Sequence, residues 1–399
     1  MEQHSVKRLL IAVLALLALL ALLLQILTIA FFTGWSAMGA QPEGARLQRI
    51  QTSTQWRDGQ FVNGLPQVEP DPVEAMQAWF GGGSPHNFPA ETPRYVQRSA
   101  QKFVSPPATG LRITWLGHST LLIEIDGLRI LVDPVWGERS SPFNWVGPRR
   151  FLPPPLALEA LPEIDAVLIS HDHYDHLDFP TIRQLIETDI PFLVPLGIGS
   201  HLEHWGVPAV RIIERDWWQE HHIGDVRLVA TPARHFSGRS ILLQDRNATL
   251  WCGWAILGPE HRVYYSGDTA MFPGFTEIGE HLGPFDATMI ESGAYNALWA
   301  DVHLGPEQAV QAHIMVGGGV MIPVHWGLFD LSLHSWTEPI ERVLAAARDH
   351  GVSVVTPRPG ASLEPTAPMP PERWWPQTPW QTAQQAPVVS SHLEGLKLP

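Results

Sequence analysis

Cysteine is nearly absent from this chain of 399 residues, which contains only Cys252. A single thiol excludes an internal disulfide framework and a zinc site built from several thiolates. Basic residues are also scarce, since 26 Lys and Arg face 40 Asp and Glu and leave a formal net charge of −14. Proteins that bind nucleic acid usually present a basic face to the phosphates, so we expect no nucleic-acid partner. Charged residues make up only 17% of the chain against 45% hydrophobic residues, which excludes a largely disordered protein.

One long stretch near the N-terminus carries no charge. Residues 9–32 are apolar apart from one Gln and one Thr, and Lys7 and Arg8 precede them. Roughly 20 apolar residues span a bilayer as a helix, and positive flanking charge stays on the cytoplasmic side. We therefore expect residues 1–33 to be an uncleaved anchor that crosses a bacterial inner membrane once and places the rest of the chain in the periplasm. A signal peptide cleaved near residues 37–40 is the alternative, although such peptides usually have an apolar core of only about 7–15 residues.

Composition divides the remaining chain into three parts. Residues 34–72 are polar with scattered Gly and Pro, and we expect a linker or an arm that lies on the main body. Residues 73–357 have the pattern of a compact domain. Residues 358–399 are rich in Pro, Gln and Trp and predict an extended tail, docked at most by its aromatic side chains.

Strand and helix patterns alternate through the compact domain. The dipeptide Asp126-Gly127 predicts a tight hairpin between strands at 120–125 and 128–132. Many antiparallel strands with a few interleaved helices favour an α+β fold, in which two sheets pack face to face and helices cover them outside. We expect helices at 179–187, 306–316 and 338–350, and further strands at 112–115, 166–169, 192–194, 226–230, 241–243, 249–257 and 263–265.

The segment 170–178 reads Ser-His-Asp-His-Tyr-Asp-His-Leu-Asp and directly follows an expected strand. On an extended loop His171 and His173 can turn toward one ion, while Asp175 and His176 can hold a second. Buried without a metal, these four groups would suffer desolvation and mutual repulsion, so we interpret the segment as metal-binding. Five histidines and two aspartates can form two sites of three protein ligands that share one carboxylate and leave positions open for water and substrate. The additional candidates are His235, Asp268 and His325.

These motifs resemble a known family. Residues 171–176 resemble the HxHxDH signature of the metallo-β-lactamase superfamily, and the three later candidates follow in the expected order. Flanking motifs are similar to those of its N-acyl-phosphatidylethanolamine-hydrolysing phospholipase D branch, and the resemblance covers about residues 75–345. The motifs are Trp-Leu-Gly-His-Ser-Thr at 115–120, Asp-Pro at 133–134, Gly-Pro-Arg-Arg-Phe at 147–151, Gly-Asp-Thr at 267–269, Gly-Pro-Phe-Asp at 283–286 and His-Trp-Gly at 325–327.

The resemblance implies an αββα sandwich, the metallo-β-lactamase fold, with two Zn²⁺ per chain. It implies that His171, His173 and His235 hold one zinc, that Asp175, His176 and His325 hold the other, and that Asp268 bridges them.

The same resemblance assigns catalytic roles to His303 and Asp175, and substrate contacts to Tyr174 and His303. Two features depart from the mammalian members, in which Gln stands at the position of Val302 and the N-terminal anchor is absent. A further residue, His118, is expected to make a structural hydrogen bond.

We therefore expect a membrane-anchored dinuclear zinc phosphodiesterase that hydrolyses N-acyl-phosphatidylethanolamine-type phospholipids to N-acylethanolamine and phosphatidic acid. Its expected partner is phospholipid at the membrane. A zinc-dependent lactonase or another hydrolase of the same fold, acting on a soluble substrate, is the alternative, and a metal-stabilised domain without catalysis is a third. The anchor favours the phospholipase, because it brings the site to the bilayer where lipid is found.

Overall fold

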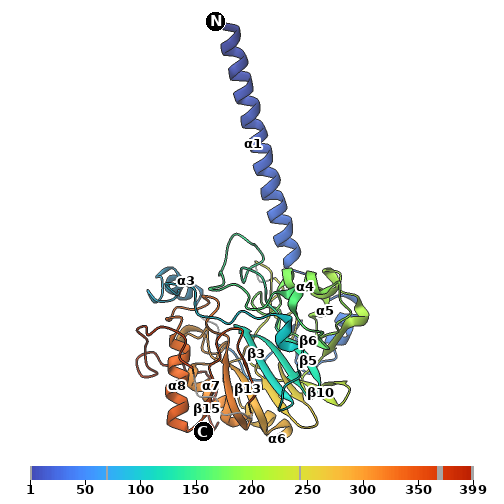
Figure 1. Ribbon diagram of the computed structural model, residues 1–399, viewed down its shortest axis with the longest axis vertical. Coiled ribbons are helices and arrows are strands. Elements are labelled where there is room, and N and C mark those ends of the chain that lie inside the picture. The colour runs from blue at the N-terminus through green and yellow to red at the C-terminus, as the bar shows by residue number, and fades with distance from the viewer. Residues whose placement is uncertain (1, 69–70, 242–243, 366–371, 397–399) are drawn as a thin grey trace.

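The computed structural model describes the chain except for residues 1, 69–70, 242–243, 366–371 and 397–399. Figure 1 shows α1 (Glu2–Ala37) as a long helix that projects from a body of stacked sheets and outer helices. Within α1 the stretch Leu10–Thr28 is long and apolar enough to cross a membrane, judged by length and composition.

The first sheet carries the predicted hairpin near its middle. Its seven strands lie in the order β16-β3-β4-β5-β6-β7-β8. Asp126 and Gly127, which join β4 to β5, both have positive φ, at 47° and 92°, as a tight turn between twisted strands requires. The strand bounds are β3 (Leu111–Gly117), β4 (Thr120–Ile125), β5 (Leu128–Val132), β6 (Ala166–Leu168), β7 (Phe192–Pro195), β8 (Ile212–Arg215) and β16 (Ser362–Leu363).

The second sheet also has seven strands, in the order β15-β14-β13-β12-β11-β10-β9. Strands β9 to β12 pair antiparallel, whereas β12 to β15 pair parallel, as β5 to β8 do in the first sheet. Each sheet thus combines the expected antiparallel pairs with parallel pairs, because helical crossovers connect many successive strands. The bounds are β9 (Glu220–Ile223), β10 (Val226–Thr231), β11 (Gly253–Leu257), β12 (Arg262–Tyr265), β13 (Phe285–Glu291), β14 (Gly318–Val324) and β15 (Ser353–Val354).

Three apolar layers hold the sandwich together. Side chains such as Ile123 and Ile256 fill the space between the two sheets. The outer face of the first sheet packs on α4 (Phe179–Leu185) and α5 (Gly199–His204). The outer face of the second packs on three helices, so the expected α+β, αββα architecture is confirmed. These helices are α6 (Gly274–Leu282), α7 (Pro306–Met315) and α8 (Glu338–His350); short 3₁₀ helices are η1 (Ala100–Phe103), η2 (Leu158–Ala160), η3 (Ala209–Arg211) and η4 (Ala297–Trp299).

The segment after the apolar run is more structured than its composition indicates. Helix α1 continues to Ala37, four residues beyond the expected anchor, and its last carbonyls accept hydrogen bonds from the body. Arg46 pairs with Glu203 at 2.7 Å and with Glu214 at 2.5 Å, which holds this arm on the body. The arm contains α2 (Gly44–Ile50), β1 (Trp56–Arg57) and β2 (Gln60–Phe61), and α3 (Pro72–Phe80) begins where it ends.

The described part of the C-terminal segment lies on the body. Strand β16 pairs with β3, so the first sheet reaches beyond the boundary expected at residue 357. Trp374 and Trp375 are buried and pack against Trp326, because this aromatic cluster offers them an apolar surface. Of the strand expected at 241–243, Ile241 lies in an exposed turn, and the other two residues are outside the described part of the chain.

Candidate metal centre

All seven side chains predicted as metal ligands meet at one edge of the sandwich. The loop 171–178 follows the carboxyl end of β6, and α4 begins directly after it. His235 follows β10, Asp268 follows β12 and His325 follows β14. All are buried except His173, which is half-buried. Carboxyl ends of strands thus place ligands that are far apart in the sequence at a common point.

The ligand atoms form two groups that contain all seven predicted ligands, and a third that joins Asp268 and His325 to Glu291 and His303. In the first, the atoms of His171, His173, His235 and Asp268 lie within 4.8 Å of one another. The His173 Nδ1 atom lies 2.8 Å from His171 Nε2 and 3.2 Å from His235 Nε2. The second group is equally compact and consists of His118, Asp175, His176 and His325.

Asp268 lies between the two groups. Its Oδ2 atom is 3.0 Å from His325 Nε2 and 3.2 Å from His176 Nε2. The same oxygen is 3.7 Å from His171 Nε2 and 3.8 Å from His235 Nε2. Burial alone would raise the pKa of the Asp268 carboxyl, but the imidazoles of His176 and His325 hold it well below its usual range. Asp268 is therefore an anionic oxygen donor that faces both groups.

Several buried atoms of this centre make no hydrogen bond. Within the described residues, His176 Nε2, Asp268 Oδ1 and both ring nitrogens of His325 are buried without a hydrogen bond. Buried polar atoms normally pair, and a divalent cation would accept the lone pairs that remain here. Imidazole and carboxylate donors are also the ligands of hydrolytic zinc sites. The donor set thus fits a pair of zinc ions.

Neighbouring groups orient the imidazoles. The His176 Nδ1–H group donates to Asp133 Oδ2 at 2.7 Å, which turns Nε2 toward the other candidate ligands. Asp133 also accepts bonds from the Ser170 amide at 2.7 Å and from the Tyr265 hydroxyl at 2.5 Å. In the sequence Asp133 stands out only as part of a family motif, which does not predict that it orients His176. An acidic residue at the end of an apolar strand, β5, was the available signal.

His118 makes the expected structural hydrogen bond. Its Nε2–H group donates to Asp175 Oδ2 at 2.8 Å. Burial and the neighbouring His325 lower the pKa of His118 to about 3, so the imidazole is neutral at pH 7. His118 thus fixes one oxygen of Asp175 without adding charge to the centre.

His303 lies beside the metal centre and is held by a carboxylate that sequence reasoning missed. Its Nδ1–H group donates to Glu291 Oε2 at 2.8 Å, and its Nδ1 atom is 3.9 Å from Asp268 Oδ2. Glu291 is fully buried and also accepts from the Thr269 amide at 2.6 Å. Burial raises the pKa of Glu291, whereas His303 opposes that shift. The sequence signal was one acidic residue at the end of the apolar strand β13.

A cavity of about 450 Å³ opens beside these ligands. His303, His173 and Asp175 line it together with the apolar side chains of Phe236 and Trp299. A wall that combines a few polar groups with aromatic rings is typical of a site that binds a small molecule.

The hydroxyl of Tyr174, the predicted substrate contact, is bonded within the protein. Its hydroxyl donates to the Arg239 carbonyl at 2.6 Å, and the Arg239 guanidinium lies 4.0 Å from its ring centre. Burial raises the pKa of Tyr174 to about 12. Because its hydroxyl is bonded to the backbone at Arg239, Tyr174 ties the ligand loop to a segment distant in sequence, and it is not among the residues that line the cavity.

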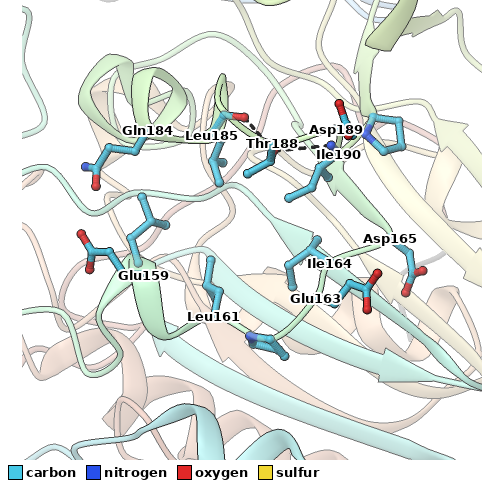
Figure 2. Close-up of a pocket in the computed structure, with 13 residues that line it drawn as sticks. Glu159, Leu161, Glu163, Ile164, Asp165, Gln184, Leu185, Thr188, Asp189 and Ile190 are labelled. Carbon is cyan, nitrogen blue, oxygen red and sulfur yellow. Dashed lines mark hydrogen bonds between the residues drawn. The ribbon is translucent and has the colours of Figure 1, made fainter.

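A second hollow, of about 710 Å³, lies between η2 and α4. Figure 2 shows that Glu159, Leu161, Glu163, Leu185 and Asp189 border it. None of its lining residues is a histidine or a predicted ligand. Although this hollow is larger than the cavity beside the ligands, it is therefore not the candidate metal site.

Comparisons with known proteins agree with this geometry. Residues 128–326 match the beta-lactamase superfamily domain. The chain is 53% identical over 348 residues to an uncharacterized protein of Mycobacterium tuberculosis, covering 85% of this chain and 92% of that protein. It is 36% identical over 248 residues to the N-acyl-phosphatidylethanolamine-hydrolyzing phospholipase D 1 of Caenorhabditis elegans, covering 59% and 69%. It also resembles the solved structure of an isothiocyanate hydrolase from Delia radicum gut bacteria, with a TM-score of 0.51 and 20% identity over 63% of this chain and 98% of that one, which shows a shared fold only.

Proposed function

Because the chain belongs to the metallo-β-lactamase superfamily, in the branch of the N-acyl-phosphatidylethanolamine-hydrolysing phospholipases D, we propose a specific reaction for this metallo-hydrolase. It is a membrane-anchored phosphodiesterase with two zinc ions per chain, and it converts N-acyl-phosphatidylethanolamine-type lipids to N-acylethanolamine and phosphatidic acid. The observation that carries the proposal is the position of Asp268 Oδ2 between two compact ligand groups, beside a cavity of about 450 Å³.

The two groups provide three ligands each and one shared carboxylate. His171, His173 and His235 would hold one zinc, Asp175, His176 and His325 the other, and Asp268 would bridge. Zinc in such a site supplies Lewis acidity and a nucleophile generated from water at neutral pH. A phosphodiester can then be hydrolysed without a nucleophilic side chain of the protein.

Residues around the cavity supply the remaining functions. Glu291 holds the Nδ1–H side of His303, so the other ring nitrogen of the doubly protonated imidazolium would donate to a phosphate oxygen as negative charge develops. The aromatic rings of Phe236 and Trp299 accommodate the apolar part of a lipid and exclude water from the reacting group. His118 keeps Asp175 in place through a neutral hydrogen bond.

A lipid panel with the full-length chain tests the proposal. The zinc-loaded protein is reconstituted in nanodiscs, and phosphatidic acid is measured with N-acyl-phosphatidylethanolamine, phosphatidylethanolamine and phosphatidylcholine as substrates, beside an N-acyl homoserine lactone. We expect phosphatidic acid from the N-acylated lipid. Hydrolysis of the lactone without release of phosphatidic acid would instead establish the alternative, a hydrolase of the same fold with a soluble substrate.

Two variants accompany this assay. Asp268→Asn removes the shared anionic oxygen and should abolish turnover. The matched control is His222→Ala, which removes an exposed imidazole on β9 and should leave turnover unchanged.

A further inference from the structure

The helix α1 meets the body without a spacer. The apolar run ends at Phe32, and Gly34 and Ala37 are already buried against the body. At 1.5 Å per residue, the step from Phe32 to Gly34 is about 3 Å along the helix. If α1 spans a bilayer, the surface of the body around its last turn must therefore lie at the level of the lipid headgroups.

The last turn of α1 is fixed to the metal-ligand loop through a buried arginine. The Arg239 guanidinium donates to the Ala37 carbonyl at 2.8 Å and to the Leu177 carbonyl at 2.9 Å, and it also donates to the carbonyl of Asp172. A second bond, from Trp205 Nε1 to the Ser36 carbonyl at 2.7 Å, fixes the same turn. The orientation of the candidate site relative to α1 is thus set by direct hydrogen bonds.

Large apolar side chains are exposed on the side from which α1 projects. Figure 1 shows α3 at this side of the body. Val73, Met76 and Phe80 of α3 are between 53% and 83% exposed. Trp35, on the last turn of α1, is 61% exposed, and Trp145 is 62% exposed.

Trp145 belongs to a loop that lies against the same turn of α1. The ring of Phe143 in this loop is so close to Gly34 that a Cβ atom there would lie 2.2 Å from Phe143 Cε1. Aromatic residues of this kind concentrate at membrane interfaces, and a soluble surface rarely exposes many large apolar groups together.

The same helix α3 borders the candidate site. Ala75 and Trp79 line the cavity that also contains His173, Asp175 and His303. One side of α3 therefore forms the cavity wall, while Val73, Met76 and Phe80 remain more than half exposed.

We propose that Trp35, Val73, Met76, Phe80 and Trp145 form a membrane-contact face, and that the cavity takes its ligand directly from the adjacent lipid leaflet. The partner is the interfacial region of a phospholipid bilayer, into which α3 inserts its apolar side. This inference rests on the anchor part of the proposed function and is independent of the reaction that the site performs.

Spin labels at single cysteines test this face in the full-length protein. The only native thiol, Cys252, is buried, so labels attach at introduced positions. Phe80→Cys and Trp145→Cys report on the proposed face in nanodiscs of zwitterionic phosphatidylcholine, which minimises repulsion of this acidic chain. The matched control is Val210→Cys in η3, an 89% exposed apolar position just before β8, at the edge opposite the ligands.

Power-saturation electron paramagnetic resonance then measures access to oxygen and to a water-soluble nickel complex. We expect the labels at 80 and 145 to favour oxygen and to lie about 5–10 Å below the phosphates, as an interfacial helix does. The label at 210 should favour nickel. Equal nickel access at all three positions would overturn the proposal.

A charge substitution separates the face from the reaction. Met76→Glu with Phe80→Glu should lower turnover of lipid in nanodiscs by about tenfold, the cost of losing about 1.4 kcal/mol of interfacial binding. Turnover of a short-chain, monomeric form of the same lipid should remain unchanged. Labels that lie in lipid, in a protein that hydrolyses no lipid, would support the membrane-contact face and refute the phospholipase function. Lipid hydrolysis by a protein whose labels are exposed to water would support the phospholipase function and refute the membrane-contact face.

Discussion

Replacing His303 with alanine separates turnover from metal binding. The side chain lines the cavity, its Nδ1–H group is bonded to Glu291 at 2.8 Å, and neither three-ligand group requires it. Only 13% of the side chain is exposed, so water replaces the lost donor poorly. Loss of one preorganised donor to a developing oxyanion typically costs about 10²–10³ in rate, or roughly 2.7–4 kcal/mol. We expect His303→Ala to lower kcat by this factor and to change KM less.

The assay measures zinc content, melting temperature and kcat on one preparation of each variant. Glu291→Gln is the companion variant, because its amide oxygen can still accept from His303 Nδ1 while the negative charge is lost. We expect it to retain both zinc ions and to lose less activity than His303→Ala. A near-normal kcat in His303→Ala would refute the role of this side chain, and loss of zinc would make it a ligand instead.

Four further predictions concern the metal, the anchor and acid stability. His173→Ala should lose zinc and activity, whereas the wild-type chain should contain two zinc ions by elemental analysis; one ion in active protein would contradict this. Asp133→Asn should weaken zinc affinity about 10–100-fold, measured by chelator competition, because His176 loses its anionic partner. Alkaline phosphatase fused after residue 45 should be active, and activity of a cytoplasm-dependent reporter alone would reverse the orientation. Burial lowers the pKa of His313 to about 4, so between pH 7 and 5 the unfolded chain binds a proton that the folded chain does not, and the free energy of unfolding falls by about 2 kcal/mol. His313→Gln should remove that part of the fall, measured by denaturant titration at both pH values. An unchanged pH dependence in the variant would refute this role of His313.

Local signals account for the parts of the fold that the sequence predicted well. The hairpin around Asp126-Gly127 depends on two residues that accept positive φ, and the flanking strands have the predicted bounds. The helix at 338–350 ends at Gly351, which has a φ of 69° as a left-handed cap. Strands β13 and β14 were not predicted, because their pairing depends on neighbours distant in sequence.

Local signals also predicted some residues of the candidate metal centre, whereas others depend on contacts between residues distant in sequence. His171, His173, Asp175 and His176 were recognisable because they are crowded within six residues, a pattern with no structural advantage in the absence of a metal. Glu291 is a single acidic residue at the end of an apolar strand, and only the assembled sandwich shows that it reaches His303.

Two further details of the structure have the same physical origin. Tyr174 lies within the signature, but its hydroxyl is bonded to Arg239, a residue that is distant in sequence. Trp374 and Trp375 lie in the tail that was expected to dock at most by its aromatic side chains, and distant aromatic residues bury them. Composition reports on neighbours along the chain, whereas these side chains are fixed by neighbours in space.

Hydrolysis in water enriched in ¹⁸O tests the central claim most directly. The full-length, zinc-loaded protein in nanodiscs is given N-acyl-phosphatidylethanolamine, and mass spectrometry locates the heavy oxygen in the products. Attack of water-derived nucleophile on phosphorus places one ¹⁸O atom in phosphatidic acid and none in N-acylethanolamine, which is the result we predict. Heavy oxygen in the N-acylethanolamine, or no release of phosphatidic acid by protein that contains both zinc ions, would contradict the account.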